Sequence, residues 1–125
     1  MEPMDCLVIY VPTDAAPAVR LAIGDAGAGR LGNYSHCSFS MEGTGRFTPL
    51  AGANPAIGAV GTAEEVAETR IEAIYPRSLR AAVVSAAVEA HPYETPAFMT
   101  FPIDVSLPPR PREETPQVPR EEAAD

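Results

Sequence analysis

One stretch of the sequence, GAGRLGNYSHCSFSM at 27–41, carries two patterns typical of functional sites. Its glycines spell G-x-G-x-x-G, the spacing of nucleotide-binding loops, and a histidine and a cysteine stand side by side as metal-type ligands. A dinucleotide-binding loop needs a strand before it and a helix N-terminus after it, whereas these glycines follow an expected helix and precede an expected strand. Because a helix C-terminus carries a partial negative charge that repels phosphate, we interpret Gly27, Gly29 and Gly32 as a turn that ends a helix, with Gly27 at the C′ position.

The histidine and cysteine are placed by the strand that we expect over 33–41. Successive side chains of a strand point to opposite faces, so His36 and Cys37 do not hold one ion together unless a bulge intervenes. This alternation predicts that Cys37 is a small core residue on the apolar face, with Phe39 and Met41. The opposite, polar face then carries Tyr34, His36, Ser38 and Ser40.

A second polar cluster is the turn HPYETPA at 91–97, which Pro92 and Pro96 stiffen. As chemistry, His91 with Glu94 could form a metal pair or an acid–base pair. As structure, this segment is a rigid turn whose polar side chains hold a neighbouring subunit, and we favour this second interpretation. The sequence contains no nucleophile elbow, no H-E-x-x-H and no C-x-x-C.

The expected secondary structure determines where these residues meet. Apolar runs and alternation predict strands at 6–12, 33–41, 66–75 and 97–103. Helical spacing predicts one helix between Asp14, its N-cap, and Gly27, with Pro17 in its first turn, and a second helix at 77–90. The order βαββαβ predicts an α+β, ferredoxin-like fold, in which a four-stranded antiparallel sheet carries two helices on one face. The other face of that sheet has no helix to cover it.

Alternation along the third strand predicts what the uncovered face carries. Its inward set is Ala67, Thr69, Ile71, Ala73 and Tyr75, and its outward set is Glu68, Arg70, Glu72 and Ile74. If the second and third strands pair as a hairpin, the uncovered face is polar and contains Tyr34, His36, Ser38, Glu68, Arg70 and Glu72. Such a face is a solvated surface, a polar subunit interface, or a ligand or metal pocket. The long connection at 42–61 is a candidate functional loop.

Composition narrows the function classes. The chain has 125 residues, a net charge of −8 and no lysine, which argues against binding to nucleic acid or to an anionic membrane. With no apolar run that could span a membrane and no signal peptide, we expect a cytoplasmic protein. Its two cysteines make no disulfide framework. We expect one domain over 1–106 and a disordered, proline-rich and charged tail over 107–125.

Three segments together carry a family resemblance over about residues 5–103: GAGRLGNYSHCSFSMEGTGRFTPLAGANPAIG, EEVAETRIEAIYP and AHPYETPAF. They resemble the PII/CutA-like domain inserted in YqfO-type proteins, which belong to the NGG-interacting-factor-three-like family, also called type-two GTP cyclohydrolase I. HPYETP is also similar to the HPYxTP segment of CutA, the divalent-cation tolerance proteins. The resemblance implies a ferredoxin-like fold and a homotrimer.

The resemblance also limits which function carries over. YqfO-type proteins hold a dinuclear metal centre in two flanking domains that have no counterpart in this sequence, so the resemblance implies a free-standing, non-enzymatic PII/CutA-like trimer. Such a trimer would bind a small-molecule effector or a divalent metal, copper, zinc or nickel, at subunit clefts. Candidate ligand-binding residues are Tyr34, His36, Arg46, Arg70, Glu72, Tyr93 and Glu94, and candidate metal ligands are His36, Cys37 and His91.

Two alternatives remain open. By analogy with PII proteins, the loop at 42–63 is a candidate effector loop, and it would dock the chain onto a protein partner of the dinuclear-metal, YqfO type. An enzyme that uses His91 and Glu94 near Tyr34 as acid–base groups is less favoured, because no nucleophile or cofactor motif accompanies them.

Overall fold

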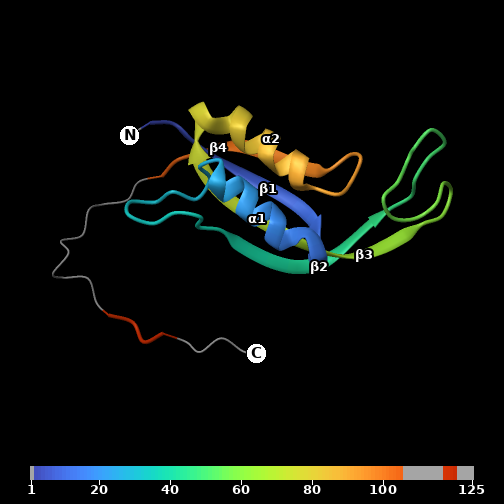
Figure 1. Cartoon of the computed structure of the whole chain (residues 1–125), viewed down its shortest axis with the longest axis horizontal. Helices are drawn as coiled ribbons and strands as arrows, with labels where there is room; N and C mark the ends of the chain where they lie inside the picture. Colours follow the sequence, from blue (N-terminus) through green and yellow to red (C-terminus); the bar gives the residue numbers. More distant parts are fainter. Residues whose placement is uncertain (1, 106–116, 121–125) are drawn as a thin grey trace.

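A computed structural model describes residues 2–105 and 117–120 (Figure 1). Within them lie the strands β1 (Met4–Pro12), β2 (Phe39–Phe47), β3 (Glu64–Pro76) and β4 (Ala97–Ile103), and the helices α1 (Ala16–Asp25) and α2 (Arg80–Ala90). Short 3-10 turns, η1 (Thr13–Ala15) and η2 (Arg77–Leu79), precede the two helices. Apart from 117–120, the tail predicted over 107–125 lies outside the described residues.

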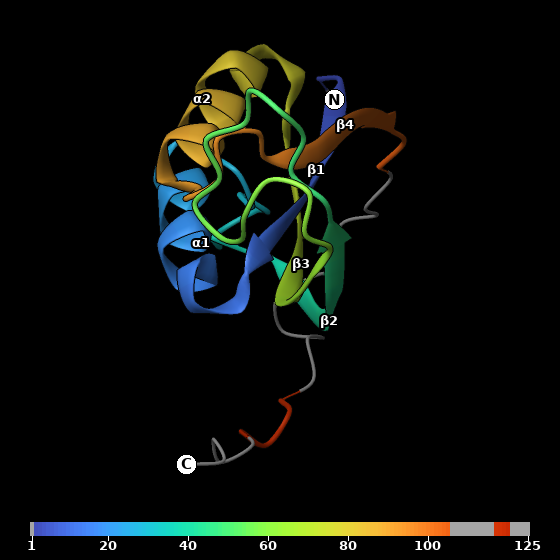
Figure 2. The same cartoon turned by 90° about the vertical axis from the view of Figure 1, so that its right-hand side faces the viewer.

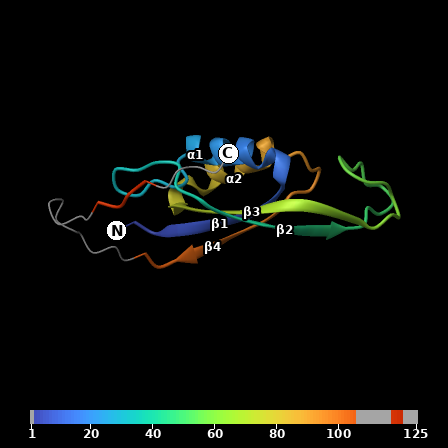
Figure 3. The same cartoon turned by 90° about the horizontal axis from the view of Figure 1, so that it is seen from below.

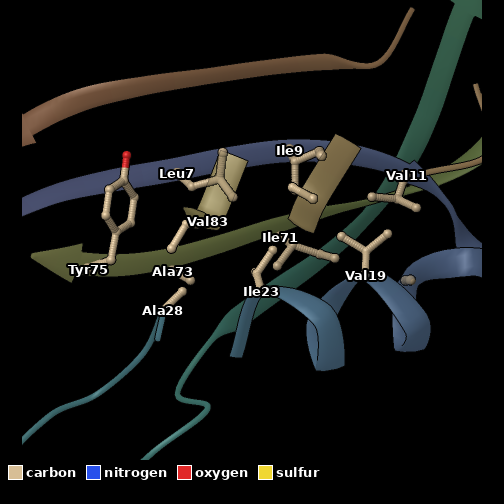
Figure 4. Packing of buried hydrophobic residues seen from close by; sticks show 12 residues of the cluster. Leu7, Ile9, Val11, Val19, Ile23, Ala28, Ile71, Ala73, Tyr75 and Val83 are labelled. Carbon is tan, nitrogen blue, oxygen red and sulfur yellow. The ribbon is translucent and has the colours of Figure 1, made fainter. Parts of the chain in front are cut away.

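The strands form an antiparallel sheet in the order β2-β3-β1-β4, and both helices lie side by side on one face of it (Figure 3). This arrangement confirms the predicted α+β, ferredoxin-like fold. The central strand β1 is buried on both faces, since Cys6 and Val8 are buried as well as the alternate residues that point to the helices. Figure 4 shows the core between sheet and helices, which is formed by Leu7, Ile9, Val11, Val19, Ile23, Ala28, Ile71, Ala73, Tyr75 and Val83.

The end of α1 has the geometry predicted for its glycine. The N–H of Ala28 donates to the carbonyl of Ile23 at 2.9 Å, and the N–H of Gly27 donates to the carbonyl of Gly24 at 3.1 Å. These are the two bonds of a Schellman motif, with Gly27 at C′ and a φ of 110°. The glycine motif therefore ends a helix, as predicted. The predicted N-cap is wrong, because Asp14 lies inside η1 and no side chain caps either η1 or α1.

The second strand was predicted at 33–41 but runs from Phe39 to Phe47. Long-range backbone bonds hold the preceding segment as a loop: the N–H of Gly29 donates to the carbonyl of Ile74 at 2.7 Å, and the N–H of Cys37 donates to the carbonyl of Gly29 at 3.0 Å. His36 lies in this loop with a φ of 59°, so strand alternation does not apply to it.

This shift also corrects the predicted faces of the sheet. Phe39 pairs with Glu72 and Met41 with Arg70, so both apolar side chains lie on the uncovered face rather than against the helices. They are 61% and 44% exposed, and Met99 and Phe101 of β4 join them there at 49% and 38%. The uncovered face therefore combines an apolar patch, defined here as Phe39, Met41, Met99 and Phe101, with the charged residues of β3.

The β2–β3 hairpin extends past the end of the helical layer and carries the connection 48–63 at its far end (Figures 1 and 3). Seen from that end, the connection faces the viewer in front of the sheet and helices (Figure 2). The loop is thus shorter than the 42–61 segment expected from sequence, because 42–47 belongs to β2. No helix among the described residues is long and apolar enough to cross a membrane.

Candidate functional site

A cleft of about 550 Å³ opens between the 48–63 connection, the turn at 91–95 and the end of β1. Its walls are mainly apolar, with Phe47, Pro49, Leu50 and Ile57 on the hairpin side. Its polar groups are Arg46, Thr48, Glu68, Tyr93, Glu94 and Thr95, together with Tyr10 near the C-terminal end of β1. Of the residues predicted to bind a ligand, Arg46, Tyr93 and Glu94 line this cleft.

His91 fixes the turn that forms one wall. Its ring is buried, with Nε2 2.7 Å from the carbonyl oxygen of Tyr10 and Nδ1 3.0 Å from the backbone nitrogen of Tyr93. Because a carbonyl only accepts and a backbone N–H only donates, Nε2 carries the proton and Nδ1 accepts. Both ring nitrogens are therefore used in holding the turn against β1.

Tyr93 and Glu68 form a polar pair inside the cleft. The Tyr93 hydroxyl donates to Glu68 Oε2 at 3.0 Å, and its ring makes an edge contact with Phe47 at a centroid distance of 5.7 Å. Burial, and then the hydrogen bond and charge of Glu68, raise the pKa of Tyr93 to about 12. The phenol therefore stays a neutral donor at physiological pH, which orients the carboxylate of Glu68.

Two further contacts hold the hairpin side of the cleft. Glu94 Oε2 accepts from the backbone N–H of Asn54 at 3.0 Å, which ties the 48–63 connection to the turn at 91–95. Arg46 Nε lies 3.1 Å from Glu65 Oε1 in an exposed ion pair along the hairpin. The connection is thus joined to the rest of the molecule at its middle as well as at its two ends.

A smaller hollow of about 280 Å³ adjoins the cleft and shares Tyr10 and Glu68 with it. Gly43 and Gly45 of β2 line this hollow, and a Cβ at Gly45 would collide with the Glu68 carboxylate. The missing side chain at Gly45 therefore leaves the space that the Glu68 carboxylate occupies.

The structure places His36 elsewhere than predicted. Its Nε2 lies 2.8 Å from Asp25 Oδ1 at the end of α1, its Nδ1 lies 2.9 Å from Ser35 Oγ, and its ring packs on Gly24. His36 is thus on the helical side of the molecule and joins the 29–38 loop to α1. It does not line the cleft.

The other predicted site residues are also separate from the cleft. Tyr34 is 75% exposed in a tight turn that pairs with Leu31, and Cys37 is half-buried in the same loop rather than in the core. Glu72 binds Arg70, with Oε2 2.9 Å from Nη2, on the uncovered face. The described residues contain no group of three histidine, cysteine or acidic side chains that could hold a metal ion, so they do not gather His36, Cys37 and His91 into one.

Glu68 and Tyr10 were not among the predicted site residues. Alternation placed Glu68 on the uncovered face, but the sequence shows neither the register that pairs Tyr10 with Arg70 nor the path of the turn that brings Tyr93 to Glu68. The signal that was available was the pair of glycines in GTG at 43–45, which marks a close approach within a strand.

Comparison with solved structures shows that the fold is the CutA-like, ferredoxin-like one. The divalent cation tolerance protein CutA from Archaeoglobus fulgidus superimposes with a TM-score of 0.57 over 83% of this chain and 87% of that one, at 19% identity. A Bacillus cereus protein related to NIF3 superimposes with a TM-score of 0.72 at 50% identity, over 83% of this chain but 26% of that one.

Curated relatives agree with the second of these structures. The chain is 48% identical over 103 residues to the "GTP cyclohydrolase 1 type 2 homolog" of Bacillus subtilis and 55% identical over 98 residues to that of Mycobacterium tuberculosis. These matches cover 82% and 78% of this chain but 28% and 26% of the relatives. None of the protein-family models matches the chain. The chain is therefore homologous to one CutA-like segment of NIF3-related proteins, which confirms the resemblance stated from the sequence.

Proposed function

We propose that this chain is a non-enzymatic CutA/PII-like module that assembles as a trimer and binds a small organic molecule in the cleft beside the 48–63 connection. The observation that carries this proposal is the cleft itself. Its volume of about 550 Å³ lies in the usual range of small-molecule sites, and it combines apolar walls with a few polar groups that point inward.

The cleft is also preorganised, which supports binding rather than an accidental gap. His91 fixes the turn to β1, Tyr93 orients Glu68, and Glu94 holds the backbone of Asn54. Because these groups are already held in place, a ligand would not have to order them on binding.

An organic ligand fits these walls better than a bare metal ion. Divalent copper, zinc and nickel select imidazole, thiolate or carboxylate groups gathered around one point. Here Glu68 and Glu94 are engaged by different donors, and the walls of the cleft are mainly apolar. The metal alternative is tested directly by titrating the metal-stripped protein with each of these three ions.

The trimer rests on the apolar patch of the uncovered face. Among residues 2–105 and 117–120, Phe39, Met41, Met99 and Phe101 lie there partly exposed. Exposed apolar patches on a sheet typically mark an interface between proteins. We infer that further copies of this chain cover the patch, as the resemblance to CutA implies.

Binding to the cleft can be tested by mapping amide chemical shifts of the isotope-labelled full chain while small fragments are added. We expect the shifts of bound fragments to cluster on Arg46, Tyr93 and the 48–63 connection. Ala56→Trp should abolish this binding because Ala56 lines the cleft, whereas Ala51→Trp, in the same connection but outside the lining, should not. Shifts that cluster elsewhere, or binding that persists in Ala56→Trp, would contradict the proposal.

A second candidate function is docking onto a protein partner of the YqfO type through the 42–63 segment. The curated relatives support this candidate, because the segment that matches this chain makes up only 28% and 26% of their longer chains. Mixing this chain with a NIF3-related protein that lacks the segment should then give a complex by size-exclusion chromatography. Arg46→Glu should weaken that complex, and Arg20→Glu on α1 should not.

A further inference from the structure

The two arginines beside the cleft and its neighbouring hollow each have a carboxylate partner. Arg46 Nε lies 3.1 Å from Glu65 Oε1, and Arg70 Nη2 lies 2.9 Å from Glu72 Oε2. A carboxylate beside a guanidinium offsets part of its positive charge and repels a bound phosphate, so such a pair attracts an anion less than a lone arginine does. Each arginine of this site therefore stands beside a carboxylate that opposes its attraction for an anion.

The two carboxylates of the cleft are not neutralised in the same way. Glu68 accepts from the Tyr93 hydroxyl and Glu94 from the Asn54 N–H, both at 3.0 Å, and both donors are uncharged. Among the ion pairs of residues 2–105, neither carboxylate has a cationic partner. The cleft therefore keeps negative charge that a ligand could compensate.

Glu68 is the better placed of the two carboxylates. It lines both the cleft and the adjoining hollow, and it lies over Gly45, where no side chain intervenes. Only one of its oxygens is engaged by Tyr93, so its remaining lone pairs can accept from a ligand.

Aromatic side chains line the same cleft as the Glu68 carboxylate. Tyr10, Phe47 and Tyr93 all line the cleft. The guanidinium carbon of Arg70 already lies 5.9 Å from the centre of the Tyr10 ring, which is the geometry of a cation–π contact. The rings thus provide a surface for both an apolar body and a positive charge.

We propose that the cleft selects an organic cation: an ammonium or amidinium group that pairs with Glu68, on an aromatic or aliphatic body that lies against Phe47 and Tyr93. This inference rests on the proposed function and names the ligand class of that same site. Glu94 also lines the cleft and adds to its negative charge. Nucleotides and other phosphate esters are the disfavoured class, since the arginines that would hold them are paired.

The test compares three probes of nearly equal shape: 2-phenylethylamine, which is cationic, 2-phenylethanol, which is neutral, and 3-phenylpropionate, which is anionic. Each is titrated into the labelled full chain at neutral pH, and affinity is read from shifts of the cleft amides. We expect the amine to bind at least about tenfold more tightly than the alcohol, because a charged partner strengthens a hydrogen bond, and the anion to bind most weakly.

Matched variants test whether the charge of Glu68 is the one that selects the amine. Glu68→Gln keeps an acceptor for Tyr93 and should weaken the amine about tenfold without weakening the alcohol. Asp104→Asn removes an exposed carboxylate beyond the opposite end of β4 and should leave all three affinities unchanged. If the alcohol or the anion binds the same cleft as tightly as the amine, the cation inference is overturned while the proposed function stands. If none of the three probes shifts the cleft amides, both are overturned.

Discussion

His91 is the residue that most directly connects the sequence motif to the shape of the cleft. Its two ring nitrogens face one obligate acceptor and one obligate donor, so the ring works as a buried brace between β1 and the turn at 91–95. A residue that sequence reasoning offers as a metal ligand or acid–base group is thus engaged on both sides by backbone. Its contribution to function is to position Tyr93.

We predict that His91→Ala lowers the free energy of unfolding by about 2–4 kcal/mol, because it leaves the Tyr10 carbonyl and the Tyr93 N–H without their partner in a buried site. His36→Ala is the matched control, and it should cost under about 1 kcal/mol since the His36–Asp25 pair is exposed. Urea unfolding measures both values. Equal losses for the two variants would contradict the bracing role of His91.

A second residue-scale prediction concerns Tyr93. Burial first, and then the hydrogen bond and charge of Glu68, raise its pKa from 10.0 to about 12, so the neutral phenol contributes stability that is fully present below pH 10 and is lost as the pH rises through 12. The difference in phenolate absorbance between the wild type and Tyr93→Phe isolates this titration. In Glu68→Gln the pKa of Tyr93 should move back toward 10.0 but not reach it, because burial remains. An unchanged midpoint in Glu68→Gln would show that the hydrogen bond does not form in solution.

At the scale of elements, the end of α1 depends on a glycine for two reasons. The first reason is that Gly27 has a φ of 110°. The second is that a Cβ at that position would lie 2.7 Å from Cδ1 of Leu79, a side chain from the turn just before α2. Gly52 has a similar φ of 97° but nothing within 4 Å of an added Cβ, so it separates backbone strain from steric contact.

We predict that Gly52→Ala costs about 1–2 kcal/mol of stability, the penalty for placing a side chain at positive φ, and that Gly27→Ala costs more. Thermal unfolding followed by circular dichroism measures the difference between the two variants. If Gly27→Ala is no more destabilising than Gly52→Ala, the contact with Leu79 adds nothing and the Schellman geometry alone explains the glycine.

Elements with a clear side-chain pattern could be predicted from the sequence, and β2 could not. The apolar run of β1, the alternation of β3 and the boundaries of β4 all follow from local pattern. β2 contains Gly43 and Gly45, which remove the alternation that would have identified a strand. The loop before it is held by backbone bonds to Ile74 and Gly29, which no local pattern reveals.

The candidate site could likewise be predicted only where its residues stand together in one local motif. The proline-stiffened motif HPYET predicts the turn that carries His91, Tyr93 and Glu94, and the last two of these residues line the cleft. The partners of His91 and Tyr93 come from β1 and β3, and the partner of Glu94 comes from the 48–63 connection. For that reason Glu68 and Tyr10 emerge only from the structure, and His36 was assigned to the wrong face.

At the scale of the whole molecule, the two faces of the sheet differ in how they are covered. The helices cover one face, while the apolar patch on the other remains exposed in a single chain. We predict that light scattering gives about three times 13.2 kDa for the full chain. Phe39→Asp should shift the mass toward one chain, since burying an unpaired carboxylate is costly.

Leu21→Asp provides the matched control for this substitution, because Leu21 is also 60% exposed but lies on the outer surface of α1. The control should keep the mass of the wild type. A single-chain mass for the wild type, or equal dissociation in both variants, would contradict the role given to the patch.

Trimer formation and cleft binding are tested together most directly by native mass spectrometry of the full chain with the tightest fragment found by the chemical-shift map. We predict a complex of three chains that carries one fragment per chain, and an Ala56→Trp complex of three chains that carries none. A single chain in place of the complex, or an Ala56→Trp complex that binds as many fragments as the wild type, would contradict this prediction.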